Sequence, residues 1–231
     1  MQRKLQITGW TLIWSALFMF GYVGYELFVT DLINSTIQTE AADGIDEVFA
    51  RTIVPPVQEV PVESAPDTEE SVVEFHPEDL PPEGTEFGVL RIPRIGLEVV
   101  IFGGVTPETL QKGPGLMPGT ALPGQPGNAV ISGHRTTYGR PFFDVDQLRP
   151  GDRIEIETAI GTHAYELREE WFVVAPTDVW VADPREGAWL TLTTCHPKFS
   201  ARERLIVTAE LVSGPNFEYV QVLEERLGEL S

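Results

Sequence analysis

Residues 188–212 read AWLTLTTCHPKFSARERLIVTAELV and contain two apolar runs separated by a short polar loop. The first run ends at Cys195, the second begins at Arg204, and both are rich in the β-branched residues that favour strands. The loop is short enough for the two strands to pair antiparallel, which would place Arg204 beside Cys195. This stretch predicts a sheet whose strand ends carry a thiol and a guanidinium group.

The rest of the chain from residue 87 onward has the same character, with short apolar or alternating runs interrupted by glycine and proline. This pattern is typical of an all-β barrel or sandwich. Thr106 and Pro107 predict the start of a short helix, and the Pro-Gly turns of residues 113–127 predict an irregular surface loop. We expect strands at residues 87–92, 95–102, 128–133, 152–158, 163–174, 177–181, 188–195 and 204–212.

Negative charge is concentrated ahead of this region. The 231 residues include 35 acidic and 16 basic ones, and the formal net charge of -19 argues against nucleic acid as a partner. Residues 31–88 hold 15 of the acidic residues, seven prolines and a single base, Arg51. We therefore expect residues 31–86 to form a disordered acidic linker.

An uncharged apolar run from Leu5 to Tyr25 precedes the linker. As a helix it would reach roughly 30 Å, enough to cross a bilayer core. Arg3 and Lys4 precede the run, so the positive-inside rule predicts a single-pass helix within residues 1–30, with the N-terminus in the cytoplasm and the remainder outside. A cleaved signal peptide is the alternative, although the run is long for one.

Cys195 is the only cysteine, which excludes an internal disulfide and a multi-cysteine zinc site, and we expect neither a metal nor a cofactor. The strand pattern alone leaves it open whether Cys195 is a core residue or a nucleophile. A nucleophilic cysteine needs a base or cation that favours its thiolate. His134 directly follows the apolar run 128–133, so it is a candidate base delivered by a strand end.

The other two histidines near these runs are weaker candidates for the base. Neighbouring side chains in a strand point to opposite faces, so His196 should point away from Cys195. We expect His163 on the solvent face of its strand. Arg204 is the candidate donor to an oxyanion, and Arg202 competes with it from the loop.

The sequence contains two motifs, Thr191-Leu192-Thr193-Thr194-Cys195 followed by Arg204, and Ser132-Gly133-His134-Arg135 running on to Tyr138. They resemble motifs of the sortases, in particular class E of the actinobacteria, and the resemblance covers roughly residues 87–213. It implies a closed eight-stranded β-barrel with short helices, in which Cys195, His134 and Arg204 are catalytic. It also implies a substrate groove that includes Thr194, Tyr138 and Met117, the last standing where the resemblance would place an aromatic residue.

The resemblance further implies a membrane-anchored cysteine transpeptidase. Such an enzyme cleaves the Thr–Gly bond of a C-terminal sorting signal, of Leu-Ala-x-Thr-Gly or Leu-Pro-x-Thr-Gly type, on a secreted protein. It transfers that protein through a thioacyl-enzyme to an amine of a lipid-linked peptidoglycan precursor. A pilin-polymerising sortase and a non-catalytic wall-binding β-domain are the alternatives. Residues 214–231 have apolar residues at helical spacing, which leaves either a short amphipathic helix or a disordered tail.

Overall fold

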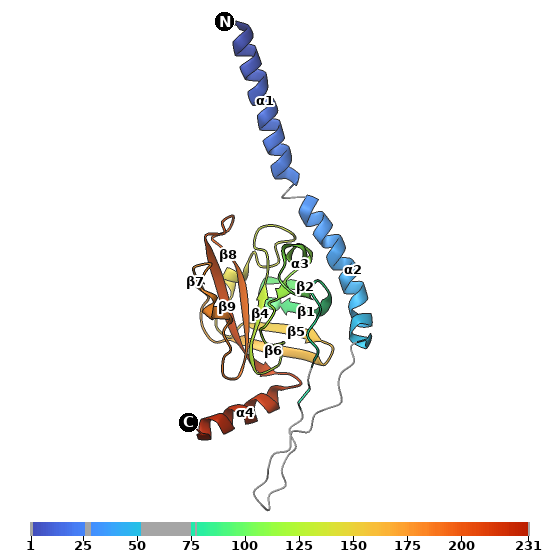
Figure 1. Cartoon of the computed structure of the whole chain (residues 1–231), viewed down its shortest axis with the longest axis vertical. Coiled ribbons are helices and arrows are strands. Elements are labelled where there is room, and N and C mark those ends of the chain that lie inside the picture. The colour runs from blue at the N-terminus through green and yellow to red at the C-terminus, as the bar shows by residue number, and fades with distance from the viewer. Residues whose placement is uncertain (1, 26–28, 52–74, 77, 231) are drawn as a thin grey trace, which may run out of the picture.

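The computed structural model describes residues 2–25, 29–51, 75, 76 and 78–230, and its strands close into a barrel (Figure 1). Eight strands follow one another in the order β6, β5, β1, β2, β3, β4, β8 and β9, and pairing of β9 with β6 closes the ring. The short strand β7 pairs with the first part of β9. The closed eight-stranded barrel that the sequence implied is confirmed.

The strands have the following bounds. They are β1 (Glu86–Ile92), β2 (Leu97–Gly103), β3 (Gly115–Leu116), β4 (Gly127–Ser132), β5 (Arg153–Thr158), β6 (Gly161–Leu167), β7 (Phe172–Val174), β8 (Ala188–His196) and β9 (Glu203–Ser213).

The barrel interior is apolar because alternate residues of each strand point inward. Leu190 and Leu192 of β8 and Leu205 of β9 are almost completely buried. Burying a side chain of this size contributes roughly 1.5–3 kcal/mol. Cys195 and Arg204 occupy the other parity and remain partly exposed, so the same alternation that fills the core presents these two groups outward.

Two of the strand predictions and one loop prediction need correction. Residues 177–181 do not form a strand; a 3-10 helix, Val179–Ala182, lies there with Val179 and Trp180 exposed. The predicted strand 163–174 is divided into β6 and β7 by the mostly polar residues 168–171. The surface loop predicted at residues 113–127 contains β3, which at two residues is too short to show a periodicity.

His163 is also placed differently from the prediction, since its side chain is fully buried. It has the parity of the core residues Tyr165 and Leu167 and lies opposite the buried Ile156 of β5, so it points to the inner face of the sheet. A side chain added at Gly124 would collide with its ring, so the segment around this glycine packs closely on it. Burial lowers the pKa of His163 to about 4. The solvent-face prediction is wrong because His163 shares the face of Tyr165 and Leu167, while the exposed Thr162 occupies the opposite face.

Helix α1 (Gln2–Gly24) contains the apolar run. Residues 6–24 are long and apolar enough to span a membrane, and none of the side chains of that window is buried in the protein. Length and composition therefore make α1 a candidate membrane span. A signal sequence has the same length and composition, so these two properties do not distinguish the two possibilities.

Helix α2 (Thr30–Arg51) occupies the first part of the predicted disordered linker, which is a correction. Ala41 and Ile45 are buried, and with Val48 and Phe49 they form an apolar stripe at helical spacing. The stripe packs on residues of β1 and β2, and Figure 1 shows α2 lying along that side of the barrel. The prediction of disorder rested on the charge and proline content of residues 31–88 taken together. The first proline is Pro55, so the part that forms α2 contains none.

Residues 52–74 and 77 of the predicted linker lie outside the described residues. At its end, the backbone of His76 exchanges two hydrogen bonds with the buried side chain of Asn216, at 2.7 and 3.0 Å. Asn216 directly precedes α4 (Phe217–Leu230), whose Val220 packs on the barrel core. The chain after residue 213 is therefore a helix, the first of the two alternatives left open by the sequence.

The predicted short helix is present as α3 (Pro107–Lys112). The hydroxyl of Thr106 accepts a hydrogen bond from the backbone N–H of Thr109 at 3.3 Å, as expected for a cap. The helix leads into the β3 segment, which pairs with β4 beside the candidate site.

Candidate active site

Two parallel strands, β4 and β8, bring His134 and Cys195 to the same end of the barrel. Their last paired residues are Ser132 and Thr193, and the backbone N–H of Gly133 donates to the Thr193 carbonyl at 3.1 Å. His134 and Cys195 each lie two residues beyond that pair. Because adjacent strands are about 4.8 Å apart, this register places the imidazole and the thiol on neighbouring chains at the same height.

The parity of β8 separates the roles of Thr194 and Cys195. Cys195 is partly exposed on the outer face, so it is not a core residue. Thr194 is buried, and its hydroxyl donates to the Gly133 carbonyl at 2.7 Å. Thr194 therefore joins the ends of β4 and β8, and its contact with substrate stays a prediction.

Arg204 lies directly opposite Cys195 in the antiparallel pairing of β8 with β9, as the sequence predicted. Its guanidinium donates to the backbone carbonyls of Ala201 and Glu203 at 3.1 and 3.0 Å. Among the described residues no carboxylate forms an ion pair with it, so its charge is available to a ligand. Arg202 is exposed in the loop before β9 begins.

The ring of His134 is half-buried, and this burial lowers the pKa of His134 below its ordinary value. The Thr137 hydroxyl lies 3.3 Å from Nδ1, and the ring centroid of Tyr138 lies 4.9 Å from that of the imidazole. A histidine with a lowered pKa is neutral near pH 7 and can accept a proton from a thiol.

Arg135 belongs to the site although the sequence analysis assigned it no role. Its side chain is only 1% exposed and forms an ion pair with Asp146 at 2.9 Å. It also donates to the Cys195 carbonyl at 3.3 Å and lies 3.0 Å from Nδ1 of His196. Arg135 thus holds the end of β8 from inside, and His196 contacts it on the face opposite Cys195.

The two remaining predicted groove residues lie on different segments. Tyr138 is half-buried in the loop after His134 and its ring packs at a tilt against the imidazole, so the structure brings it to the site. Met117 follows β3, and its backbone N–H donates to Val130 of β4 at 2.8 Å. Met117 is therefore placed along β4, several residues before the strand end that carries His134.

A hollow of about 220 Å³ lies on the outer face that carries Arg204. Ile206 and Thr208, which line it, follow Arg204 at alternate positions of β9 and therefore share its face. Phe172, which pairs with Ile206, and Trp180 also line it, and their two rings stack with centroids 6.0 Å apart. The hollow therefore lies along β9, on the face that carries Arg204.

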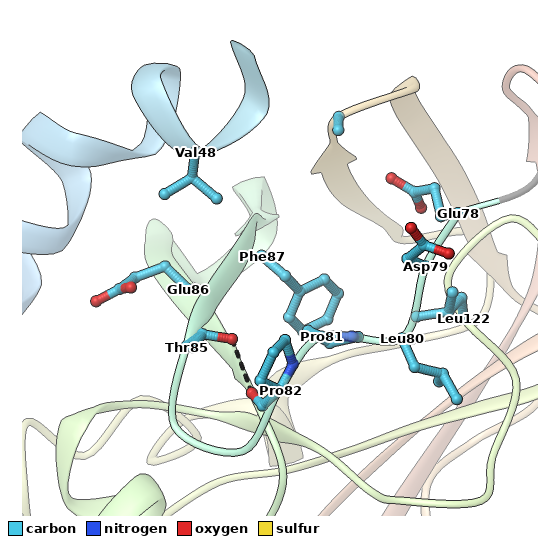
Figure 2. Close-up of a pocket in the computed structure, with 11 residues that line it drawn as sticks. Val48, Glu78, Asp79, Leu80, Pro81, Pro82, Thr85, Glu86, Phe87 and Leu122 are labelled. Atoms are coloured by element: carbon cyan, nitrogen blue, oxygen red, sulfur yellow. Dashed lines mark hydrogen bonds between the residues drawn. The ribbon is translucent and has the colours of Figure 1, made fainter. Parts of the chain in front are cut away.

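A larger hollow of about 500 Å³ lies elsewhere (Figure 2). Its walls include Val48 of α2, Phe87 at the start of β1 and Leu122 just before β4. The starts of β1 and β4 lie at the barrel end opposite Cys195, because these two strands run in the same direction. This hollow therefore contributes nothing to the chemistry at Cys195.

No group of three or more His, Cys, Asp or Glu residues that could hold a metal ion occurs in the part of the chain that the structure describes. The groups that the fold brings together are a thiol, an imidazole and a guanidinium. Such groups can supply a nucleophile, a proton acceptor and a donor to an oxyanion, the set that acyl transfer through a cysteine requires.

A closed β-barrel with a cysteine, a histidine and an arginine on three adjacent strand ends defines a class of cysteine acyl-transfer enzymes. The family model described as "Sortase domain" matches residues 90–212, more than half of the chain. The chain belongs to the sortase family.

Relatives of class E confirm the subclass that the sequence motifs indicated. Sortase SrtE1 of Streptomyces coelicolor is 34% identical over 146 residues, which are 56% of this chain and 41% of that protein. The match thus spans less than half of that relative. The structure of sortase E from Streptomyces avermitilis is 40% identical, with 57% of this chain and 90% of the other aligned at a TM-score of 0.53.

A sortase of another class resembles the chain over a longer stretch. The Clostridium perfringens sortase D5 transpeptidase is 27% identical and covers 78% of this chain and 99% of its own, with a TM-score of 0.58. The barrel is therefore shared across classes.

Proposed function

We propose that the protein is a membrane-anchored cysteine transpeptidase that cleaves a Thr–Gly bond in a C-terminal sorting signal and transfers the protein to a cell-wall amine. The observation that carries this proposal is the partly exposed Cys195, directly opposite Arg204 and on the strand neighbouring His134. The Clostridium perfringens relative is called a transpeptidase, which supports the same reaction here.

In the first half-reaction, the sulfur of Cys195 attacks the threonine carbonyl carbon while His134 takes the thiol proton. Arg204 donates hydrogen bonds to the carbonyl oxygen as it becomes an oxyanion. The C–N bond then breaks, His134 returns the proton to the leaving glycine nitrogen, and a thioester remains on Cys195. The neutral resting state of His134, which follows from its lowered pKa, suits this proton acceptor role.

In the second half-reaction, an amine of the lipid-linked peptidoglycan precursor attacks the thioester carbon. His134 takes a proton from that amine, the C–S bond breaks, and Cys195 leaves as the thiol. An amide replaces the original peptide bond, so neither an oxidant nor an energy source is needed. Tyr138 and Met117 are proposed to contact the signal, and the hollow beside Ile206 is proposed to receive its upstream residues.

A helix with the properties of α1 suits the two substrates, both of which are held at the membrane. We propose that α1 remains in the membrane with its N-terminus in the cytoplasm and the barrel outside, as Arg3 and Lys4 indicate.

The test is an assay of the full-length protein in detergent micelles with Leu-Ala-x-Thr-Gly and Leu-Pro-x-Thr-Gly peptides, each with and without an added amine. We expect a product in which the amine is joined to the threonine carbonyl. Cleavage that ignores the amine would identify a hydrolase instead. A protein that binds the peptides without cleaving them would support a wall-binding domain.

A further inference from the structure

The first turn of α2 contacts the loop that follows His134. One carboxylate oxygen of Asp31 accepts a hydrogen bond from the Gly139 backbone N–H at 3.0 Å. The other forms an ion pair with Arg140 at 3.1 Å, and the Asp31 side chain is 23% exposed. A single carboxylate of α2 thus holds two consecutive residues of the loop, five and six positions after His134.

The loop needs an external contact because its backbone is strained. Tyr138, Gly139 and Arg140 have φ values of 51°, 74° and 51°, three consecutive residues in the left-handed region. Non-glycine residues in this region cost on the order of 1 kcal/mol each. A side chain added at Gly139 would collide with Asn34, so α2 also restricts this position by close packing.

Two further side chains fix α2 itself on the barrel. Asn34 is 6% exposed and donates to the carbonyls of Gln111 and Lys112 at 2.8 and 2.9 Å. Gln38 accepts from the Val100 N–H at 2.8 Å and donates to the Val100 carbonyl at 3.2 Å. Strand β3 pairs only with Phe102 and Gly103 of β2, so it does not reach Val100. The Gln38 side chain therefore supplies the hydrogen bonds to Val100 that a longer neighbouring strand would make.

The loop touches His134 directly. The ring of the strained residue Tyr138 packs at a tilt against the imidazole, and the hydroxyl of its neighbour Thr137 contacts Nδ1. A continuous set of contacts thus joins Asp31 to Gly139, Gly139 to Tyr138, and Tyr138 to His134. This set begins outside the residues that match the sortase family model.

We infer that α2 is a positioning element for catalysis, and that Asp31 is a positioning residue that holds the 136–140 loop, and through it the His134 ring, in its working orientation. This inference rests on the proposed function of His134. It assigns a role to a helix in the segment between the candidate membrane span and the barrel.

The experiment compares the full-length wild type with Asp31→Ala and Asp31→Asn in detergent micelles. The matched control is Asp43→Ala, which removes an exposed carboxylate from the same helix. Hydrogen exchange of residues 136–142 should accelerate roughly 10-fold in Asp31→Ala, the scale of one lost charge-assisted hydrogen bond. Strands β8 and β9 should stay protected, and Asp31→Asn, which keeps an acceptor for Gly139, should lie between.

Turnover of a sorting peptide provides the second measurement. For Asp31→Ala we expect kcat to fall roughly 10- to 100-fold with little change in KM, as for a misplaced catalytic group. The acid limb of the pH–rate profile should move up toward the ordinary histidine range, because a released loop leaves the ring less buried. Arg140→Ala, which removes the other partner of the ion pair, should reproduce part of both effects.

The outcomes separate this inference from the proposed function. Unchanged exchange of residues 136–142 in Asp31→Ala, or an equal change in Asp43→Ala, overturns the inference. Faster exchange with unaltered kcat overturns the positioning role. A wild type inactive on every peptide refutes the proposed function, whereas the exchange rates still decide whether Asp31 holds the loop.

Discussion

Thr194 and Cys195 are adjacent in β8, and their side chains do opposite things because a strand alternates faces. The buried Thr194 hydroxyl ties β8 to the carbonyl of Gly133, one residue before His134. Cys195 faces outward opposite Arg204. The spacing between imidazole and thiol therefore depends on a buried hydrogen bond beside the reacting groups as much as on those groups themselves.

At the residue scale, the prediction that distinguishes the two arginines concerns Arg204. A guanidinium presents a planar pair of donors that an ammonium lacks, so Arg204→Lys should lose most activity although the charge is kept. We expect kcat to fall on the order of 10²–10³, the scale of a lost oxyanion donor. Steady-state cleavage of a fluorogenic sorting peptide measures this.

Arg202→Ala is the control for that experiment. Arg202 is exposed and lies before the first residue of β9, so its loss should change kcat only a few-fold. A larger defect in Arg202→Ala than in Arg204→Lys would show that Arg204 does not contact the oxyanion.

At the element scale, the strong periodic patterns identified most of the strands, and local turn chemistry identified α3. The failures have physical causes that a strand pattern does not carry. Val179 and Trp180 are apolar, which favoured a strand, but they are exposed and belong to a 3-10 helix. Apolar composition alone does not show that a segment pairs with a neighbouring strand. The helical stripe of α2 was hidden by averaging charge over a segment whose second part holds all the prolines.

The site was predictable where it follows from strand ends. Cys195 and His134 each end an apolar run, and the length of the loop after Cys195 set the register of Arg204. Arg135 and Asp31 were not predictable in this way, because their partners do not lie on strands whose register the sequence indicates. Arg135 pairs with Asp146 and Asp31 with Arg140, and only the folded chain brings these groups together.

Strand β6 supports a pH-dependent prediction through His163. The folded state binds no proton at this ring until the pH approaches 4, whereas the unfolded chain binds one near 6.5. The free energy of unfolding should therefore decrease as pH falls from about 6.5 toward 4, by a total on the order of 3 kcal/mol from this residue. Urea unfolding of the full-length chain at a series of pH values measures the slope.

His163→Gln is the comparison, since it removes the titrating ring. Glu78, whose carboxyl is near Thr158 on the same network, acts in the opposite sense: burial raises its pKa, so its protonation favours the folded state. Because Glu78 is present in both proteins, the difference between the two slopes reports His163. Equal slopes below pH 6.5 would contradict the burial of this ring.

At the scale of the whole molecule, α2 begins a few residues after α1 and its first turn contacts the His134 loop. In a chain that α1 anchors, this contact keeps the catalytic end of the barrel near the membrane. Figure 1 shows α1 continuing from that end of α2, while α4 lies toward the other end of the barrel.

The anchor itself gives a prediction that cells can test. A reporter fused after residue 231 should be active only outside the cytoplasmic membrane, and the protein should remain in the membrane fraction at its full length. Replacing Arg3 and Lys4 with glutamate should reduce correctly oriented insertion, because the positive charges set the orientation. A shortened protein in the culture medium would instead identify a cleaved signal sequence.

The measurement that tests the central claim most directly is the intact mass of the full-length protein after brief incubation with a sorting peptide. We predict a mass increase equal to the peptide up to and including its threonine, mapped by digestion to Cys195 and lost on addition of an amine. Cys195→Ala should fold, because the change removes little buried volume, and should show no increase. An acyl adduct on another residue, or peptide cleavage by Cys195→Ala, would contradict the account.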